Sequence, residues 1–96
     1  IIEMNELAKE NNAVFVLIFI PDENQVYGDA TTLEIDHISN FAEENNIFHI
    51  NPLSKLQEIG KQEKDLYFTL DKHFNEKGNQ LFAEILFDEF TKKELI

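Results

Sequence analysis

The pattern of apolar and polar positions predicts two strands separated by a helix. The apolar run Ala13 to Ile20, dense in branched and aromatic residues, ends at Pro21 and predicts a strand buried on both faces of a parallel sheet. A shorter run from Ile47 to Ile50, closed by Asn51-Pro52, predicts a second strand. Between the runs, apolar residues recur at helical spacing, which predicts a crossover helix: Leu33, Ile35, Ile38, Phe41 and Ala42.

Polar residues mark where the predicted helices begin and end. A first helix within residues 1–12 stops at Asn11-Asn12, and Asn45-Asn46 ends the crossover helix. Thr31 and Glu34 have the spacing of a capping box at the start of that helix. We expect residues 21–30 to form a loop.

The last third of the chain predicts two more helices with a brief extended stretch between them. Leu53, Leu56 and Ile59 indicate a helix that breaks near Gly60, and the extended stretch covers Leu66 to Leu70. Asn75 is the expected N-cap of a final helix, and Gly78 the residue that lets its first turn approach the sheet. One face of this helix is apolar: Gly78, Leu81, Phe82, Ile85, Leu86 and Phe90.

Alternating helices and strands indicate an α/β fold with a parallel sheet, here about two strands and four helices. A strand as apolar as Ala13 to Ile20 needs neighbours on both edges, yet the chain offers one other clear strand. We therefore expect residues 1–96 to be the carboxyl-terminal part of a larger α/β domain. The alternative is a sheet completed by self-association through an exposed strand edge.

Composition removes several classes of partner and site. With 96 residues the chain is one domain at most, and its 43% apolar share is enough to pack. A net charge of −11 and the absence of Arg disfavour nucleic acid and anionic lipid as partners. No Cys is present, so a thiolate metal site and a Cys nucleophile are excluded. The longest apolar run is too short for a membrane helix, and the sequence leaves the compartment open.

One segment combines residue types that carry chemistry. Asp71 and His73 precede the final helix, and residues two apart in extended chain point to the same side. A carboxylate beside an imidazole fixes its tautomer and stabilises the imidazolium, so the pair has the properties of a general base with its orienting group. His37 is better explained as a residue on the solvated or half-buried face of the crossover helix. His49 is better explained as a core or edge residue of the second strand whose ring is hydrogen-bonded. Because a metal site would need distant His residues to converge, no cofactor or metal is expected.

The string Asp71-x-His73-Phe74-Asn75-x-x-Gly78, followed by an amphipathic helix, resembles the last motif block of the SGNH (GDSL-type) hydrolases. The order of the upstream segments is also similar to the branch with acyltransferase-like members: the strand ending at Ile20-Pro21, then Val26-Tyr27, Asn51-Pro52-Leu53 and Leu66-Tyr67-Phe68. Many members have two residues between this Asp and His, whereas this chain has one. The resemblance implies a flavodoxin-like three-layer α/β/α fold, and an Asp and a His of a catalytic triad at Asp71 and His73.

The resemblance further implies that the nucleophilic Ser lies outside these residues. Ser39 falls inside the crossover helix and Ser54 near the start of the next helix, and neither stands in a strand-to-helix elbow. We therefore expect an inactive portion of an esterase that acts on an acyl ester through a Ser-His-Asp triad. The alternatives are an O-acyltransferase of the same superfamily and a non-catalytic α/β interaction module.

Overall fold

The computed structural model describes residues 1–96, which form seven helices and strands in two compact units. The sheet unit comprises Ile1–Phe19 and Thr32–Asn51, and the hairpin unit comprises Ile20–Thr31 and Pro52–Ile96. The elements run α1 (Ile2–Glu10), β1 (Val16–Ile18), α2 (Glu23–Tyr27), α3 (Leu33–Glu44), β2 (Phe48–Ile50), α4 (Leu53–Gly60) and α5 (Glu76–Lys92). No helix combines the length and the apolar character needed to cross a membrane.

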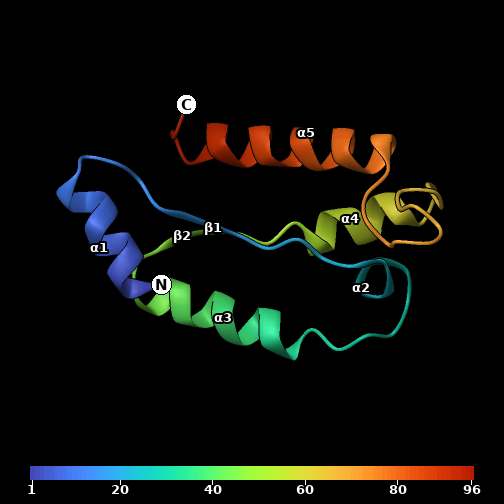
Figure 1. Ribbon diagram of the computed structural model, residues 1–96, viewed down its shortest axis with the longest axis horizontal. Helices are drawn as coiled ribbons and strands as arrows, with labels where there is room; N and C mark the ends of the chain where they lie inside the picture. The colour runs from blue at the N-terminus through green and yellow to red at the C-terminus, as the bar shows by residue number, and fades with distance from the viewer. The chain divides into compact units, whose positions relative to one another are not determined.

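The sheet unit contains the parallel pair that the apolar runs predict. β1 pairs with β2 so that Leu17 lies opposite His49, and α3 packs beside β2 (Figure 1). Asn12 and Asn46 follow α1 and α3 with φ of 57° and 56°. Asn tolerates this left-handed conformation better than most residues, which is why both Asn-Asn pairs end helices as predicted. The mixed helix and strand content is compatible with the α/β class.

The first strand differs from its prediction in length and in burial. Only Val16–Ile18 pairs, and all three residues are half-buried, whereas Val14 and Ile20 are exposed. The prediction of a strand buried on both faces is wrong because β2 is its single neighbour in a two-stranded sheet. The apolar positions of α1 are also exposed, namely Ile2, Met4 and Leu7.

The predicted capping box at Thr31 and Glu34 is also wrong. α3 starts at Leu33 with Thr32 as its N-cap, one residue later than the capping-box spacing requires. The Thr32 hydroxyl donates to the Asp36 carboxylate at 3.1 Å instead. A capping box does form at Asp22 and Gln25, where it starts the short helix α2 in the segment predicted as a loop. A helix of five residues is too short to show a periodic apolar pattern, and the chain therefore has five helices against the predicted four.

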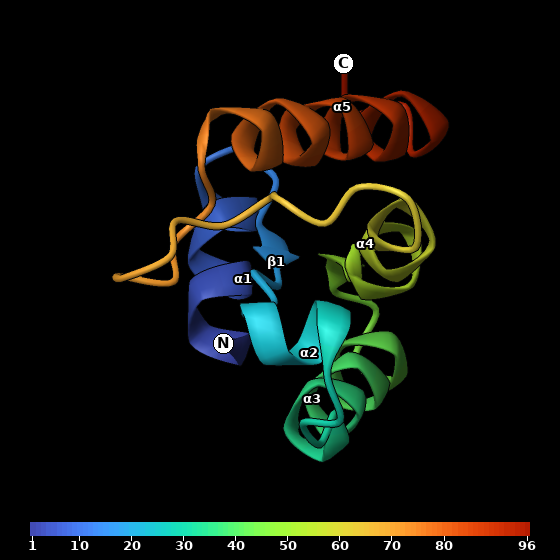
Figure 2. The ribbon, with the colours of Figure 1, turned by 90° about the vertical axis from the view of Figure 1, so that its right-hand side faces the viewer.

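The hairpin unit holds the larger apolar core, built from α2, α4, α5 and the segment between α4 and α5. Its buried members are Val26, Leu53, Leu56, Leu66, Tyr67, Phe74 and Ile85. Leu81 and Phe82 of α5 pack against this core, which confirms the predicted apolar face. The extended stretch predicted for Leu66 to Leu70 is reduced to one antiparallel bridge between Tyr67 and Phe74, in the connection coloured yellow to orange (Figure 2).

Candidate functional site

Asp71 and His73 lie near the tip of a tight hairpin, residues 67–74, directly before α5. The Tyr67–Phe74 bridge closes its base, and the Phe68 amide donates to the His73 carbonyl at 2.7 Å. The Lys72 amide donates back to the Phe68 carbonyl at 3.2 Å, and Lys72 has a φ of 63°. A left-handed residue reverses the chain within a few positions, which brings both candidate residues to the tip.

The two side chains face each other without forming a direct hydrogen bond. Asp71 Oδ1 lies 3.7 Å from His73 Nδ1, beyond normal hydrogen-bond length. The same oxygen accepts a bond from the His73 backbone N–H at 3.0 Å, which replaces the direct carboxylate–imidazole bond expected of a triad. The imidazole is 85% exposed, and His73 Nε2 makes no hydrogen bond within the chain. The two side chains are close because the turn at Lys72, with its left-handed backbone, brings them together. The prediction that an extended chain places them on the same side is wrong, since Asp71 lies in a turn.

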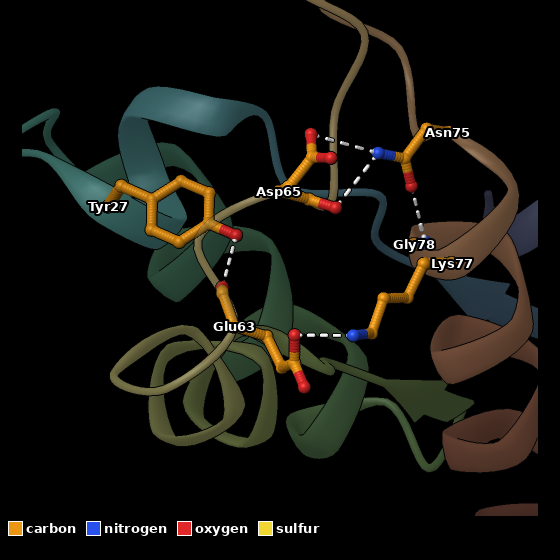
Figure 3. Close-up of polar contacts among 6 residues, drawn as sticks. All are labelled: Tyr27, Glu63, Asp65, Asn75, Lys77 and Gly78. Carbon is orange, nitrogen blue, oxygen red and sulfur yellow. Dashed lines mark hydrogen bonds and ion pairs between the residues drawn. The ribbon is translucent and has the colours of Figure 1, made fainter.

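Asn75 anchors the base of the hairpin to α5 (Figure 3). Its Oδ1 accepts from the Gly78 amide at 2.9 Å, which confirms the predicted N-cap. Its Nδ2 donates to the Asp65 carbonyl at 2.8 Å, and its backbone N–H donates to the Leu66 carbonyl at 2.9 Å. One residue therefore ties the hairpin to the helix and to the segment that precedes the hairpin.

Position 78 requires Gly because the first turn of α5 closely approaches another segment of the chain. That segment is the base of the hairpin, whereas the sequence predicted the sheet. A Cβ atom at this position would lie 2.1 Å from the Leu66 carbonyl oxygen and 2.8 Å from Cδ1 of Phe74. The first turn of α5 therefore packs on the base of the hairpin, so the predicted approach to the sheet is wrong. Any side chain at position 78 would push the hairpin away from the helix.

Tyr67 fastens the hairpin to the segment that follows β1 in the chain. Its hydroxyl donates to the Pro21 carbonyl at 2.8 Å, and its ring stacks on Phe74 with centroids 4.8 Å apart. Burial raises the pKa of the Tyr67 phenol, so it stays a hydrogen-bond donor over the whole ordinary pH range. An exposed ion pair between Lys72 and Glu23, at 3.3 Å, makes a second connection to the start of α2. Sequence reasoning placed Tyr67 in an extended stretch and in a segment of the resemblance, but assigned no role to its hydroxyl.

A further contact steadies the turn that leads to the hairpin (Figure 3). The Tyr27 hydroxyl donates to the Glu63 carbonyl at 2.7 Å, and the Glu63 carboxylate forms an ion pair with Lys77 of α5. The base of the hairpin is therefore hydrogen-bonded to and packed on α5, whereas its tip is exposed to solvent.

The other candidate side chains have structural explanations. His49 Nδ1 lies 3.1 Å from the Ile47 carbonyl, and His37 is exposed on α3. Ser39 lies within α3 with its hydroxyl buried and unpartnered, whereas Ser54 is exposed on α4. Neither Ser stands in a strand-to-helix turn. No group of three or more His, Asp and Glu side chains is arranged to hold a metal ion.

Chemically, the hairpin tip offers an exposed imidazole with a carboxylate beside one of its nitrogens. Such a pair can accept a proton on Nε2 while the carboxylate stabilises the resulting imidazolium. Comparisons with protein-family models, curated proteins and solved structures give no match for this chain.

Proposed function

We propose that this chain is the carboxyl-terminal part of an SGNH-type ester hydrolase, in which His73 is the general base and acid and Asp71 is its orienting carboxylate. The observation that carries the proposal is the exposed imidazole at the hairpin tip with Asp71 Oδ1 3.7 Å from Nδ1. Catalytic hydrogen bonds are often long before substrate binds, so a modest rotation completes the pair. The nucleophilic Ser and the oxyanion donors belong to residues outside these 96.

In the proposed reaction, His73 takes the proton from the Ser hydroxyl as the oxygen attacks the acyl carbonyl. The imidazolium then gives this proton to the leaving alcohol, which leaves an acyl-enzyme. Water attacks the acyl-enzyme in a hydrolase, and a sugar hydroxyl attacks it in an O-acyltransferase, which is the alternative outcome of the same chemistry. The proposed fold is a flavodoxin-like three-layer α/β/α fold. In it, β1 and β2 are two strands of a larger parallel sheet.

The test is ester hydrolysis by the complete gene product. It should release nitrophenol from 4-nitrophenyl acetate, and His73→Ala should lower the rate by about a thousandfold, as expected for loss of a general base. Asp71→Asn should also lower the rate, and His37→Ala serves as the matched exposed-His control. The 96-residue chain alone should be inactive. Activity that survives His73→Ala, or a gene product limited to these 96 residues, would overturn the proposal.

A second candidate function is an interaction module that associates through the sheet unit. Strands β1 and β2 each lack a second neighbour, and large apolar residues of the same unit are exposed: Ile1, Ile2, Met4, Leu7, Val14, Leu33 and Phe48. Open strand edges without charged residues favour pairing with another chain. Sedimentation of the purified chain tests this candidate, because it requires a concentration-dependent dimer or larger species.

A further inference from the structure

A pocket of about 430 Å³ opens beside His73, within the hairpin unit. Carbon surface makes up most of its walls: Ile20 and Pro21 come from the segment after β1, and Tyr67 and Phe74 from the hairpin. Ile20 is 70% exposed, so a branched apolar side chain stands at the pocket with most of its surface open to solvent. We call this space the hairpin pocket.

Most polar side chains around the hairpin pocket already have partners within the protein. The Asp22 carboxylate accepts the Gln25 amide at 2.9 Å, and Lys72 is paired with Glu23 at 3.3 Å. The remaining polar contacts are those of the Tyr67 hydroxyl with Pro21 and of the Asn79 amide with the Phe74 carbonyl. The imidazole of His73 is the exception, because Nε2 makes no hydrogen bond. A ligand therefore meets carbon along most of its length and one reactive polar group.

The charges near the hairpin pocket also restrict its ligand. Asp22, Glu23 and Asp71 are acidic, and Lys72 is the single ammonium group among these neighbours. The local excess of negative charge opposes a carboxylate or phosphate on the bound group. A polyhydroxylated ligand is also unfavourable, because few unpaired donors and acceptors remain to replace its lost hydration.

We propose that the hairpin pocket binds the uncharged aliphatic acyl chain of an ester whose carbonyl lies at His73. This inference rests on the proposed function and narrows its substrate class to esters of unsubstituted aliphatic acids. The chain would contact Ile20, Pro21 and the ring edges of Tyr67 and Phe74, and each methylene that it buries would strengthen binding.

The inference is tested by binding to the 96-residue chain, without turnover. Methyl hexanoate is titrated while NMR signals of the Ile20 methyl groups and the Phe74 ring are followed. We expect these signals to shift, with an affinity about tenfold higher than that of methyl acetate because of the longer apolar chain. The hexanoate anion should bind more weakly than the ester. Equal affinity of the anion and the ester, or shifts that avoid these residues, would overturn the inference.

Ile20→Asn removes the exposed apolar wall without emptying a buried position. It should weaken methyl hexanoate binding about fivefold. Phe87→Asn is the matched control, because Phe87 is 61% exposed on α5 and lies outside the pocket. A loss of affinity common to both variants would refute a specific pocket.

The binding and turnover results separate the two proposals. His73-dependent hydrolysis of 4-nitrophenyl acetate by the gene product, with no pocket shifts in this titration, would overturn the pocket and leave the catalytic proposal standing. Ligand binding in the hairpin pocket together with ester hydrolysis that is unaffected by His73→Ala would overturn the catalytic proposal. In that case the pocket would be an apolar ligand site, and its assignment to an ester substrate would fail as well.

Discussion

The sheet unit and the hairpin unit differ in how far they bury their own apolar residues. The hairpin unit encloses seven buried core residues, and Leu56 and Leu66 have no exposed surface. The sheet unit buries Ala42, Ile47 and Ile50, yet it contains the most apolar run of the whole sequence. The unit that contains the most apolar segment of the sequence therefore buries fewer apolar residues than the other unit.

A fully apolar strand needs packing partners on both faces and paired strands at both edges, whereas an amphipathic helix needs a packing partner on one face only. α5 meets that need within the hairpin unit, because Ile85, Leu81 and Phe82 contact the local core. β1 has one strand neighbour and remains half-buried. The hairpin unit therefore covers its own apolar faces, whereas each strand of the sheet unit keeps one unpaired edge.

The sharpest test of this comparison is a pair of Leu substitutions. Leu56→Ala empties a fully buried position in the hairpin unit and should lower the free energy of unfolding by about 3 to 4 kcal/mol. Leu7→Ala removes a side chain that is 60% exposed in the sheet unit and should cost less than about 0.5 kcal/mol. Urea unfolding followed by circular dichroism gives both values. Equal losses would show that α1 is covered in solution.

Gly78→Ala tests the close packing of α5 on the hairpin. A Cβ at 2.1 Å from a backbone oxygen forces the helix and the hairpin apart, so we expect a loss of about 3 kcal/mol. Gly60→Ala is the matched control in α4, because its new Cβ meets side-chain atoms of Tyr27 and Val26 at 3.0 and 3.2 Å. Side chains yield more easily than backbone, and Ala favours a helix, so this variant should change stability by less than about 1 kcal/mol. A milder effect at Gly78 than at Gly60 would contradict the packing described for the hairpin.

The sequence predicted the parts of this fold that depend on local signals. The two Asn-Asn helix ends, the Asn75 cap and the apolar face of α5 are all present. Each of these follows from the conformational preference of one residue or from a period of apolar positions. Such signals act within a few residues, and tertiary contacts did not override them here.

One local signal failed, the capping box expected at Thr31 and Glu34, because α3 begins one residue later than it requires. Other errors arose where a distant contact decides the outcome. The length and burial of β1 depend on how many strands lie beside it, and its own residues carry no record of that number. The partner of Gly78 is the Leu66 carbonyl, which no local pattern identifies. At the candidate site, the positions of Asp71 and His73 before the last helix followed from sequence, whereas their 3.7 Å separation depends on the turn at Lys72.

Tyr67→Phe asks whether the hairpin depends on its buried hydroxyl. The change leaves the Pro21 carbonyl without its donor and should cost about 1 to 2 kcal/mol, while the stacking on Phe74 is preserved. NMR signals of the His73 ring should shift, because the hairpin loses its tie to the segment after β1. Tyr27→Phe is the matched control, since its hydroxyl donates to the Glu63 carbonyl outside the hairpin. If both variants move the His73 signals equally, Tyr67 has no special role in holding the tip.

Alkaline pH should destabilise the hairpin unit through the same phenol. Burial raises the pKa of Tyr67 above the ordinary value of 10.0, so above that pH the unfolded chain loses a proton that the native state keeps. The free energy of unfolding therefore falls as pH rises, by about 1.4 kcal/mol per pH unit for this group. The chain has two Tyr and no Trp, so in the Tyr27→Phe variant the ultraviolet absorbance of tyrosinate follows Tyr67 alone. Ionisation of Tyr67 at its ordinary pKa in a chain with native circular dichroism would contradict its burial.

The smallest effect we expect comes from the ion pair between α4 and α5, which tests whether charge adds to the core of the hairpin unit. The hydrogen bond from Lys55, at 2.7 Å, lowers the pKa of Glu89. A lowered carboxyl pKa stabilises the native state above the ordinary Glu pKa, and this contribution disappears as pH falls through the native value. Because the Lys55 side chain is 43% exposed, solvent screening should limit the loss of unfolding free energy in Lys55→Met to about 0.5 kcal/mol at pH 7, and to less at about pH 3.

Lys61→Met is the control for this ion pair. The Lys61–Glu58 pair lies at the end of α4, and both side chains are more than 70% exposed. Urea unfolding should therefore show no measurable change in this variant. A cost in Lys55→Met that persists unchanged at acidic pH would mean that its aliphatic stem, and not its charge, stabilises the contact of the two helices.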